Sequence, residues 1–279
     1  MFHIKKMSAK DIEFAVNLTG TMNWGLAEYD FNFIMSIEPE GCFILLHDSE
    51  RIGLITSISF GKIGWFGNLI VNEKYRGKGA GSLLVNHCVK YLRSKNVETV
   101  GLYAYIDKIP FYRRLGFKYD SEFIVLKGKG ICTQTTAKVK EAEKGDVEKI
   151  IHYDQLCFRG SREKLLKPLL QDPDNLCYVS FDNRDILGYV IAKNYGEKAE
   201  IGPLVCHKGR ADIAADLLKT SLNSLKDLDV SMCINTKEPS LINMLRKSGF
   251  GEKFRVARMF SEMPIAKECI YAAESLERG

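Results

Sequence analysis

The pattern of apolar and polar positions repeats along the chain at an offset of about 135 residues. Residues 4–12 and 139–147 both read as an apolar strand, a polar turn and the start of a helix. In each copy, two apolar runs joined by a polar turn follow at 41–55 and 176–190, which is typical of a β-hairpin. Because matching elements keep this spacing over the whole length, we predict two copies of one fold.

The stretch between the copies, from Lys127 to Thr136, is rich in glycine, lysine and other polar residues. Such a composition is typical of a flexible or extended linker. We therefore predict a first domain at residues 1–127, a linker at 128–137 and a second domain at 138–279.

A glycine-rich turn in the first copy separates a predicted strand from a predicted helix. The strand is Leu69-Ile70-Val71, the turn is Arg76-Gly77-Lys78-Gly79-Ala80-Gly81, and the helix continues from Ser82. Glycines let the backbone come close to an anion, and the start of a helix carries roughly half a positive charge. Arginine and lysine add full charges. The segment predicts a phosphate-binding loop, with a charged surface turn as the alternative.

The spacing within this turn separates the known classes of phosphate loop. A Walker loop needs Ser or Thr directly after its lysine, but Lys78 is followed by Gly79. A dinucleotide-binding loop needs its third glycine where Ser82 stands. The pattern R-x-x-G-x-G/A fits in full at Arg76, Gly79 and Gly81. It resembles the pyrophosphate loop of the GNAT family, the Gcn5-related N-acetyltransferases, which bind acetyl-coenzyme A.

Residues 109–117 carry a second match to this family. Their sequence, Ile-Pro-Phe-Tyr-Arg-Arg-Leu-Gly-Phe, resembles the x-x-x-Y-x-x-x-G-F ending of GNAT domains. In that family the tyrosine is the usual general acid for the coenzyme A thiolate, so the resemblance implies this role for Tyr112; a packed aromatic side chain is the alternative. One departure is that the asparagine often found after the fifth strand is not obvious here, because Tyr105 to Lys108 occupy its place. The resemblance covers about residues 1–125 and implies that the first domain is catalytic.

The second copy lacks both features. Its turn after Leu204-Val205 keeps a single glycine, Gly209, and has Asp212 at the helix entry, where a pyrophosphate would be repelled. Leu245 stands at the position of Tyr112, and leucine cannot donate a proton. We therefore predict that the second domain neither binds coenzyme A in the same way nor catalyses, but covers the acceptor side of the first.

The whole chain then resembles a two-domain GNAT subgroup with an active N-terminal and a degenerate C-terminal domain. The resemblance implies an α/β (α+β) fold of two tandem GNAT-like domains, each a mixed, mostly antiparallel central sheet flanked by helices. We also predict that a chain cut after Gly130 leaves a first domain that still binds acetyl-coenzyme A, whereas acceptor-dependent turnover falls sharply.

The implied activity is transfer of an acetyl group from acetyl-coenzyme A to a primary amine of a small molecule or peptide, by direct attack in a ternary complex. The pantetheine arm is expected between two parting strands, around residues 69–71 and 102–105, with a backbone N–H near Leu69 or Ile70 steadying the oxyanion. The residues expected to bind the co-substrate are Leu69, Ile70, Val71, Arg76, Gly77, Lys78, Gly79, Ala80, Gly81 and Ser82.

An amine acceptor requires a base, because an amine of pKa about 10.4 is almost fully protonated at pH 7. Residues 23–30 fall where GNAT domains place their acceptor-binding loops. Within them, Glu28 and Asp30 are the candidate bases; plain surface carboxylates are the alternative.

Other functions are compatible with the same motifs. The enzyme could transfer a longer acyl group or acylate a hydroxyl group. A different class is an acetyl-coenzyme A sensor or interaction protein without turnover, against which Tyr112 argues.

Composition narrows the partners and the compartment. A net charge of +5 is mild and comes without a basic stripe interleaved with aromatics, so we expect no nucleic acid. With 46% hydrophobic residues and no run near the roughly 18 needed to span a bilayer, we expect no membrane partner. The eight cysteines form no C-x-x-C pair, so we expect neither a metal site nor a disulfide framework, and a reducing, cytoplasmic compartment. The oligomeric state does not follow from the sequence.

Overall fold

The computed structural model describes residues 1–131, 135, 139–183, 185–207, 209–263 and 269–279. Much of the predicted linker, at 132–134 and 136–137, lies outside the described residues, as does Arg184 of the second predicted hairpin turn. The boundaries at 127 and 138 therefore stay a prediction.

The first half of the chain alternates short helices with strands whose apolar faces are buried. Its strands are β1 (Phe2–Lys6), β2 (Cys42–His47), β3 (Glu50–Phe60), β4 (Ile63–Val71), β5 (Thr99–Tyr105) and β6 (Lys118–Lys129). Its α-helices are α1 (Ile12–Gly20), α2 (Glu28–Ile37), α3 (Ala80–Ser94) and α4 (Ile109–Arg114), and single 3₁₀ turns occupy Ala9–Asp11, Glu73–Tyr75 and Ile106–Lys108.

The second half repeats this order of strands and α-helices and then adds one strand. Its strands are β7 (Val139–Glu141), β8 (Leu176–Asp182), β9 (Asp185–Asn194), β10 (Lys198–Cys206), β11 (Asp229–Asn235), β12 (Gly251–Phe260) and the additional β13 (Ile270–Ala272). Its helices are α5 (Val147–Phe158), α6 (Glu163–Gln171), α7 (Ala211–Ser224) and α8 (Pro239–Lys247), with a 3₁₀ turn at Lys144–Asp146. The repeat predicted from the hydrophobic pattern is confirmed.

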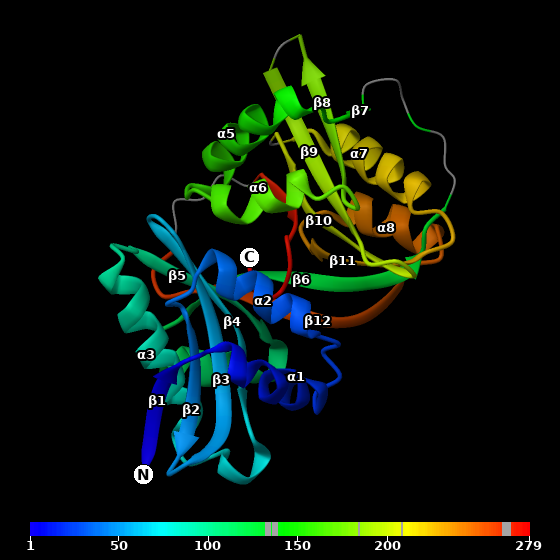
Figure 1. The fold of residues 1–279 in the computed structure, drawn as a ribbon. Coiled ribbons are helices and arrows are strands. Elements are labelled where there is room, and N and C mark those ends of the chain that lie inside the picture. The colour runs from blue at the N-terminus through cyan, green and yellow to red at the C-terminus, as the bar shows by residue number, and fades with distance from the viewer. Residues whose placement is uncertain (132–134, 136–138, 184, 208, 264–268) are drawn as a thin grey trace.

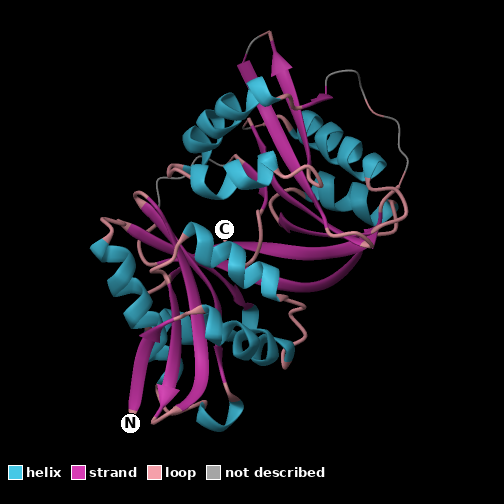
Figure 2. Ribbon diagram, viewed as in Figure 1, coloured by secondary structure: helices cyan, strands magenta, loops and turns pink. Residues whose placement is uncertain are grey.

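The described strands form one continuous sheet in the order β1-β2-β3-β4-β5-β12-β6-β11-β13-β10-β9-β8-β7. Two of its strand pairs are parallel, β4 with β5 and β10 with β11, and the other paired strands are antiparallel. Helices cover the sheet in both halves (Figure 2). The predicted fold class, a mixed and mostly antiparallel sheet flanked by helices and present twice, is confirmed.

The two halves exchange a strand. From the second half, β12 lies between β5 and β6 and pairs with both, while residues 123–129 of β6, in the first half, pair with β11. Both strands run from one half to the other in Figure 1. Main-chain hydrogen bonds of β12 and β6 therefore join the two halves, and a strand of the second half completes the sheet of the first.

Apolar cores lie on both faces of the sheet, and the direction in which each strand side chain points decides the core to which it belongs. In β4, Phe66 packs with α3 and α4 on one face, whereas Trp65 lies on the other face in a cluster shared with α1, α2, α5 and α6. Successive strand residues point to opposite faces, which explains the division. Trp65 is 1% exposed, so this shared core is buried between the two halves.

Candidate active site

The glycine-rich turn forms an open loop at the start of α3. Gly77 and Gly79 have φ of 76° and 83°, the left-handed region that side chains rarely adopt, and Gly79 directly precedes the helix. A Cβ at either position would meet no atom within 4 Å, so the loop faces free space. The first turn of any α-helix leaves main-chain N–H groups without helical acceptors. The loop therefore has the shape and the donors of an anion cradle.

Arg76 ties this loop to the end of β4. Its Nε donates a hydrogen bond to the main-chain oxygen of Val71 at 2.9 Å, which fixes the side chain beside the strand. The Lys78 ammonium lies 5.6 Å from the centre of the Tyr75 ring, and both basic residues are exposed. The sequence-predicted co-substrate residues from Leu69 to Ser82 thus come together where β4 ends and α3 begins.

A gap opens between β4 and β5 beside this loop. Their parallel pairing runs from Ile63 with Thr99 to Trp65 with Gly101 and then stops, although both strands continue. Beyond that point β4 keeps its pairing with β3, and β5 keeps its pairing with β12. Strand edges without a neighbour leave backbone groups that an extended ligand can pair with.

A bulge in β4 lies at this gap. The pairing with β3 shifts between Gly67 and Ile70, and Asn68 has a φ of 51°. Its Nδ2 donates to Thr56 Oγ1 at 3.1 Å, which holds the bulge. Bulges re-aim backbone groups and are frequent next to active sites. This bulge was not predicted from the sequence, although asparagine tolerates a left-handed backbone and Asn68 stands inside an otherwise apolar run.

Tyr112 of α4 lies on the same face of the sheet as the loop. Its ring centre is 6.1 Å from that of Phe66 in β4, and it is 8% exposed. Its hydroxyl makes no hydrogen bond with a described residue, and burial raises the pKa of Tyr112 well above its usual range. A Cβ at Gly81 would lie 3.4 Å from the ring of Phe111, so α4 and the start of α3 are in contact range. The hydroxyl thus stays protonated and has a free donor.

Two family models match the chain one after the other. The acetyltransferase (GNAT) family matches residues 16–117, and an acetyltransferase (GNAT) domain model matches residues 150–272. The chain is a tandem GNAT protein.

The relatives of this GNAT protein are named as acetyltransferases or acyltransferases. The uncharacterized N-acetyltransferase YitH of Bacillus subtilis is 22% identical over 285 residues, covering 98% of this chain and 97% of that protein. Holothin acyltransferase of a Pseudoalteromonas species is 24% identical over 269 residues, covering 92% and 87%. A putative acetyltransferase from Pyrococcus horikoshii shares the fold with a TM-score of 0.83 at 17% identity, covering 100% of this chain and 96% of that chain. The GNAT protein is an acyltransferase of the N-acetyltransferase type, as predicted.

The two predicted bases lie at the start of α2 in this GNAT protein. Asp30 Oδ2 accepts a hydrogen bond from the main-chain N–H of Ala27 at 2.9 Å, which caps the helix. Glu28 is exposed and makes no hydrogen bond or ion pair with a described residue. Asp30 therefore has a structural task, and the catalytic role of either residue stays a prediction.

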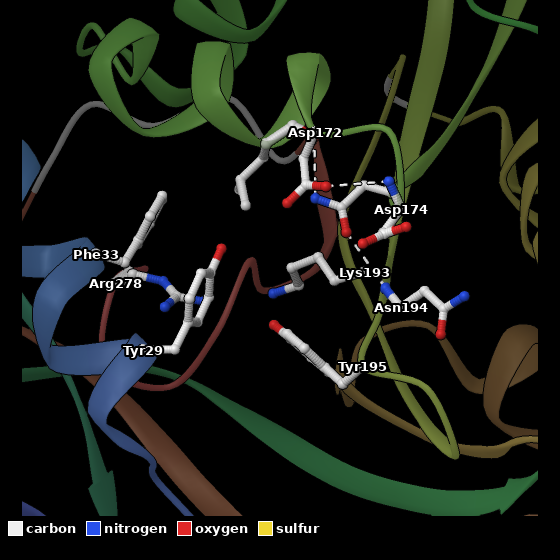
Figure 3. Close-up of a pocket in the computed structure, with 10 residues that line it drawn as sticks. Tyr29, Phe33, Asp172, Asp174, Lys193, Asn194, Tyr195 and Arg278 are labelled. Atoms are coloured by element: carbon white, nitrogen blue, oxygen red, sulfur yellow. Dashed lines mark hydrogen bonds between the residues drawn. The ribbon is translucent and has the colours of Figure 1, made fainter.

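A cavity of about 180 Å³ lies next to them, between α2 and the second half. In Figure 3, Tyr29 of α2, Asp172 of the turn after α6, and Lys193 and Tyr195 at the end of β9 point toward a common space. Arg278 forms another wall, with its guanidinium 5.3 Å from the centre of the Phe33 ring. The cavity joins residues from both halves, and none of those in the second half was expected from the sequence.

The second half of the GNAT protein has a strand where the first half has a gap. Its β10 and β11 also pair only at their beginnings, from Lys198 to Ile201 with Asp229 to Met232, and β13 then lies between them. The main chain approaches so closely there that a Cβ at Gly202 would lie 2.0 Å from the Ala273 oxygen. The slot that corresponds to the gap of the first half is thus filled by the chain itself.

The turn before α7 differs from the loop before α3. Gly209 keeps a left-handed φ of 79°, but the guanidinium of Arg210 pairs with Asp212 at 2.8 Å at the helix start, and the pKa of Asp212 is lowered to about 2, mainly by this hydrogen bond. Leu245, the counterpart of Tyr112, is fully buried. An ionised carboxylate thus stands at the entry of α7.

Within the described residues, no helix has the length and apolar character needed to cross a membrane. The same residues hold no group of three or more His, Cys, Asp or Glu placed to bind a metal ion. Every cysteine that the structure describes is free.

Proposed function

We propose that this GNAT protein transfers an acetyl group from acetyl-coenzyme A to a primary amine of a small molecule or peptide, by direct attack in a ternary complex. The observation that carries the proposal is the alignment, along one face of the first half, of an open anion loop, an unpaired strand gap and the free hydroxyl of Tyr112. An acetyl-coenzyme A sensor without turnover is the alternative, but it gives no role to that hydroxyl.

In this proposal the loop from Arg76 to Ser82 holds the pyrophosphate, and the pantetheine lies along Leu69 to Val71 in the gap. The bulge at Asn68 turns a main-chain N–H of β4 toward the thioester oxygen, where it stabilises the developing oxyanion. Binding energy from the remote pyrophosphate then holds the thioester in place for attack. The first domain acts as the catalytic domain, and the second covers the acceptor side.

Tyr112 assists the departure of the thiolate. Because burial raises its pKa, the phenol is neutral at physiological pH and acts as a hydrogen-bond donor. A thiol has a pKa near 8.5, below that of the phenol, so full proton transfer before the C–S bond breaks is uphill. Tyr112 therefore shares its proton with the sulfur in the transition state.

Replacing Tyr112 with phenylalanine should lower kcat by roughly 10²-fold, within the usual range for general acid catalysis. The ring keeps its packing against Phe66, so the Kd for acetyl-coenzyme A, measured by calorimetry, should not change. Tyr119→Phe, which removes an exposed hydroxyl from β6, is the control. An unchanged kcat in Tyr112→Phe would show that Tyr112 only packs.

Calorimetry should find one acetyl-coenzyme A site per chain. One gap is open and its counterpart is filled by β13, and a carboxylate stands at the entry of α7. Two equivalent sites per chain would contradict this assignment.

The proposed reaction is tested by following thiol release from acetyl-coenzyme A over a panel of primary amines, peptides and alcohols. Turnover with amines supports the proposal. Binding without turnover on every acceptor favours the sensor. We also propose a cytoplasmic location, because the free and mostly buried cysteines suit a reducing compartment.

A further inference from the structure

The segment after β13 reaches the site of the first half. Gly67 of β4 stands directly before the bulge, and a Cβ there would lie 2.4 Å from the Cα and 2.6 Å from the Cβ of Glu277. The main chain of Glu277 thus lies flat on β4 at the gap. The end of the described chain is visible between the two halves in Figure 1.

Glu277 and Tyr112 lie on opposite faces of the sheet. Gly67 shares its face with Trp65, because alternate strand residues point the same way, whereas Phe66 and Tyr112 belong to the other face. A thioester held at the bulge would then have the phenol on one side and Glu277 on the other. This is the arrangement that amine attack and thiolate departure require.

The cluster around Glu277 contains one more carboxylate than it has cations. Lys193 Nζ, which has three N–H donors, contacts Glu200 Oε2 at 2.8 Å and both the main-chain oxygen and Oε1 of Glu274. Arg278 binds Glu274 twice, through Nε at 3.0 Å and Nη2 at 3.1 Å. The two cations are thereby matched by Glu200 and Glu274.

Glu277 is the third carboxylate of this cluster. Its Oε1 is 3.6 Å from Arg278 Nη1, too far for a hydrogen bond, and its side chain is 19% exposed. When it is ionised, the cluster of Lys193, Arg278, Glu200, Glu274 and Glu277 has a net charge of −1. The neighbouring Arg162, which donates to the main-chain oxygen of Gly279 at 2.8 Å, does not change this balance, because it is paired with Asp154 at 2.6 Å. A buried excess charge is costly unless a proton or a cation neutralises it.

We propose that Glu277 is the base that takes the proton from the acceptor ammonium, and that the second half delivers this base to the site of the first. The inference rests on the proposed acetylation of an amine. It also specifies the acceptor as a cationic amine, since an ammonium brings the positive charge that the cluster lacks. The raised pKa of Glu277, about 7, mainly a result of burial, agrees with such a role at neutral pH.

The acceptor ammonium has three protons, and it loses two of them during the reaction. Glu277 takes one proton from the ammonium, and the nitrogen lone pair then forms the C–N bond to the thioester carbon. The C–S bond breaks and sulfur takes its electron pair together with the proton of Tyr112. The nitrogen loses a second proton, which restores Tyr112 through water, and keeps the third as the amide N–H. Glu277 returns its proton to solvent.

The test is the pH dependence of Glu277→Gln with an amine on which the wild type turns over. In the wild type, kcat/KM should rise with pH through about 7, as Glu277 ionises, and then level off. In Glu277→Gln, kcat/KM at pH 7 should fall by roughly 10²-fold or more and rise tenfold per pH unit toward the pKa of the amine. The Kd for acetyl-coenzyme A should be unchanged, and Glu98→Gln, at an exposed glutamate, is the control.

A weakly basic acceptor separates a base from a structural residue. Aromatic amines such as aniline, and acyl hydrazides, are neutral at pH 7 and have no ammonium proton to lose before attack, so the wild type and Glu277→Gln should react with them at rates within about threefold of each other. A merely structural residue would slow both classes of amine equally, and that result would overturn the proposal.

Folding provides a further check. Because burial raises the pKa of Glu277 above its unfolded value, the native state loses stability as pH rises through about 7, and glutamine does not ionise. The melting temperature of Glu277→Gln minus that of the wild type should therefore be larger at pH 8 than at pH 5. If the variant does not fold, Glu277→Asp keeps the carboxylate and should retain the rise through neutral pH.

The outcomes distinguish the two proposals. If the wild type is active and Glu277→Gln has the same dependence of kcat/KM on pH, only the role of Glu277 is overturned. If kcat/KM no longer rises with pH in Glu28→Gln or Asp30→Asn, the base lies in α2 instead. A wild type that acetylates no amine overturns both.

Discussion

Gly79→Val is expected to weaken acetyl-coenzyme A binding by roughly 10²-fold or more. Gly79 has a φ of 83°, and a left-handed backbone costs a side chain about 1–2 kcal/mol, more when it is β-branched. The new side chain also enters the free space that the loop faces, where the pyrophosphate is proposed to bind. Loss of one or two charge-assisted hydrogen bonds, about 1.5–3 kcal/mol each, accounts for the expected change.

The second half offers a matched control for this substitution. Gly209 has a φ of 79° before α7 and is likewise free of atoms within 4 Å of a Cβ. Gly209→Val should lower the melting temperature about as much as Gly79→Val but leave the Kd unchanged. Equal losses of affinity in both variants, or none in Gly79→Val, would contradict the assignment of the loop.

A fragment that ends at Gly130 is expected to be insoluble or unfolded and to bind no acetyl-coenzyme A. It lacks β12, which pairs with five residues of β5 and nine of β6. It also lacks the apolar side chains that β12 buries, among them Met259 and Phe260. Without β12 and β11, β5 has one unpaired edge and β6 has two, which is a hazard for aggregation.

Co-expression provides the control for this prediction. A second fragment, residues 138–279, supplies β12 from outside and should restore a soluble complex that binds the co-substrate. Circular dichroism, size-exclusion chromatography and calorimetry measure the outcome. A monomeric, folded 1–130 fragment with full affinity would agree with the sequence-based expectation and would show that the exchanged strand is dispensable.

The sequence predicted what local patterns specify. A strand, a glycine-rich turn and a helix in succession identified the loop from Arg76 to Ser82, and the repeat of apolar runs identified the tandem. The parting of β4 and β5 was expected from the resemblance to GNAT domains and not from a local pattern, and their pairing does stop after Trp65 and Gly101.

The exchange of strands could not be predicted from such patterns. Both β6 and β12 follow a short helix and a Gly-Phe step, at Phe117 and Phe250, so either strand suits either sheet. Periodicity specifies the face that a residue takes and not the partner of its strand. The choice is made by packing over the whole molecule.

The cluster at Glu277 was missed for a related reason. Its contact with Gly67 joins positions that are 210 residues apart, and a glutamate in a polar stretch reads as a solvated residue. Lys193 gave the one available signal, since it interrupts an apolar strand and such a lysine must find a buried partner.

The additional strand β13 competes with any ligand for the slot between β10 and β11 of the second half. A segment tethered within the same chain acts at an effective concentration that reaches the millimolar range for short connections, and it is present in every molecule. A free ligand that enters this slot has to displace β13, and the main-chain hydrogen bonds of β13 with β10 and β11 are then lost. Restoring glycines before α7 and a tyrosine at Leu245 would therefore not suffice to recreate a second active site, because displacing β13 would also withdraw Glu277 from the first.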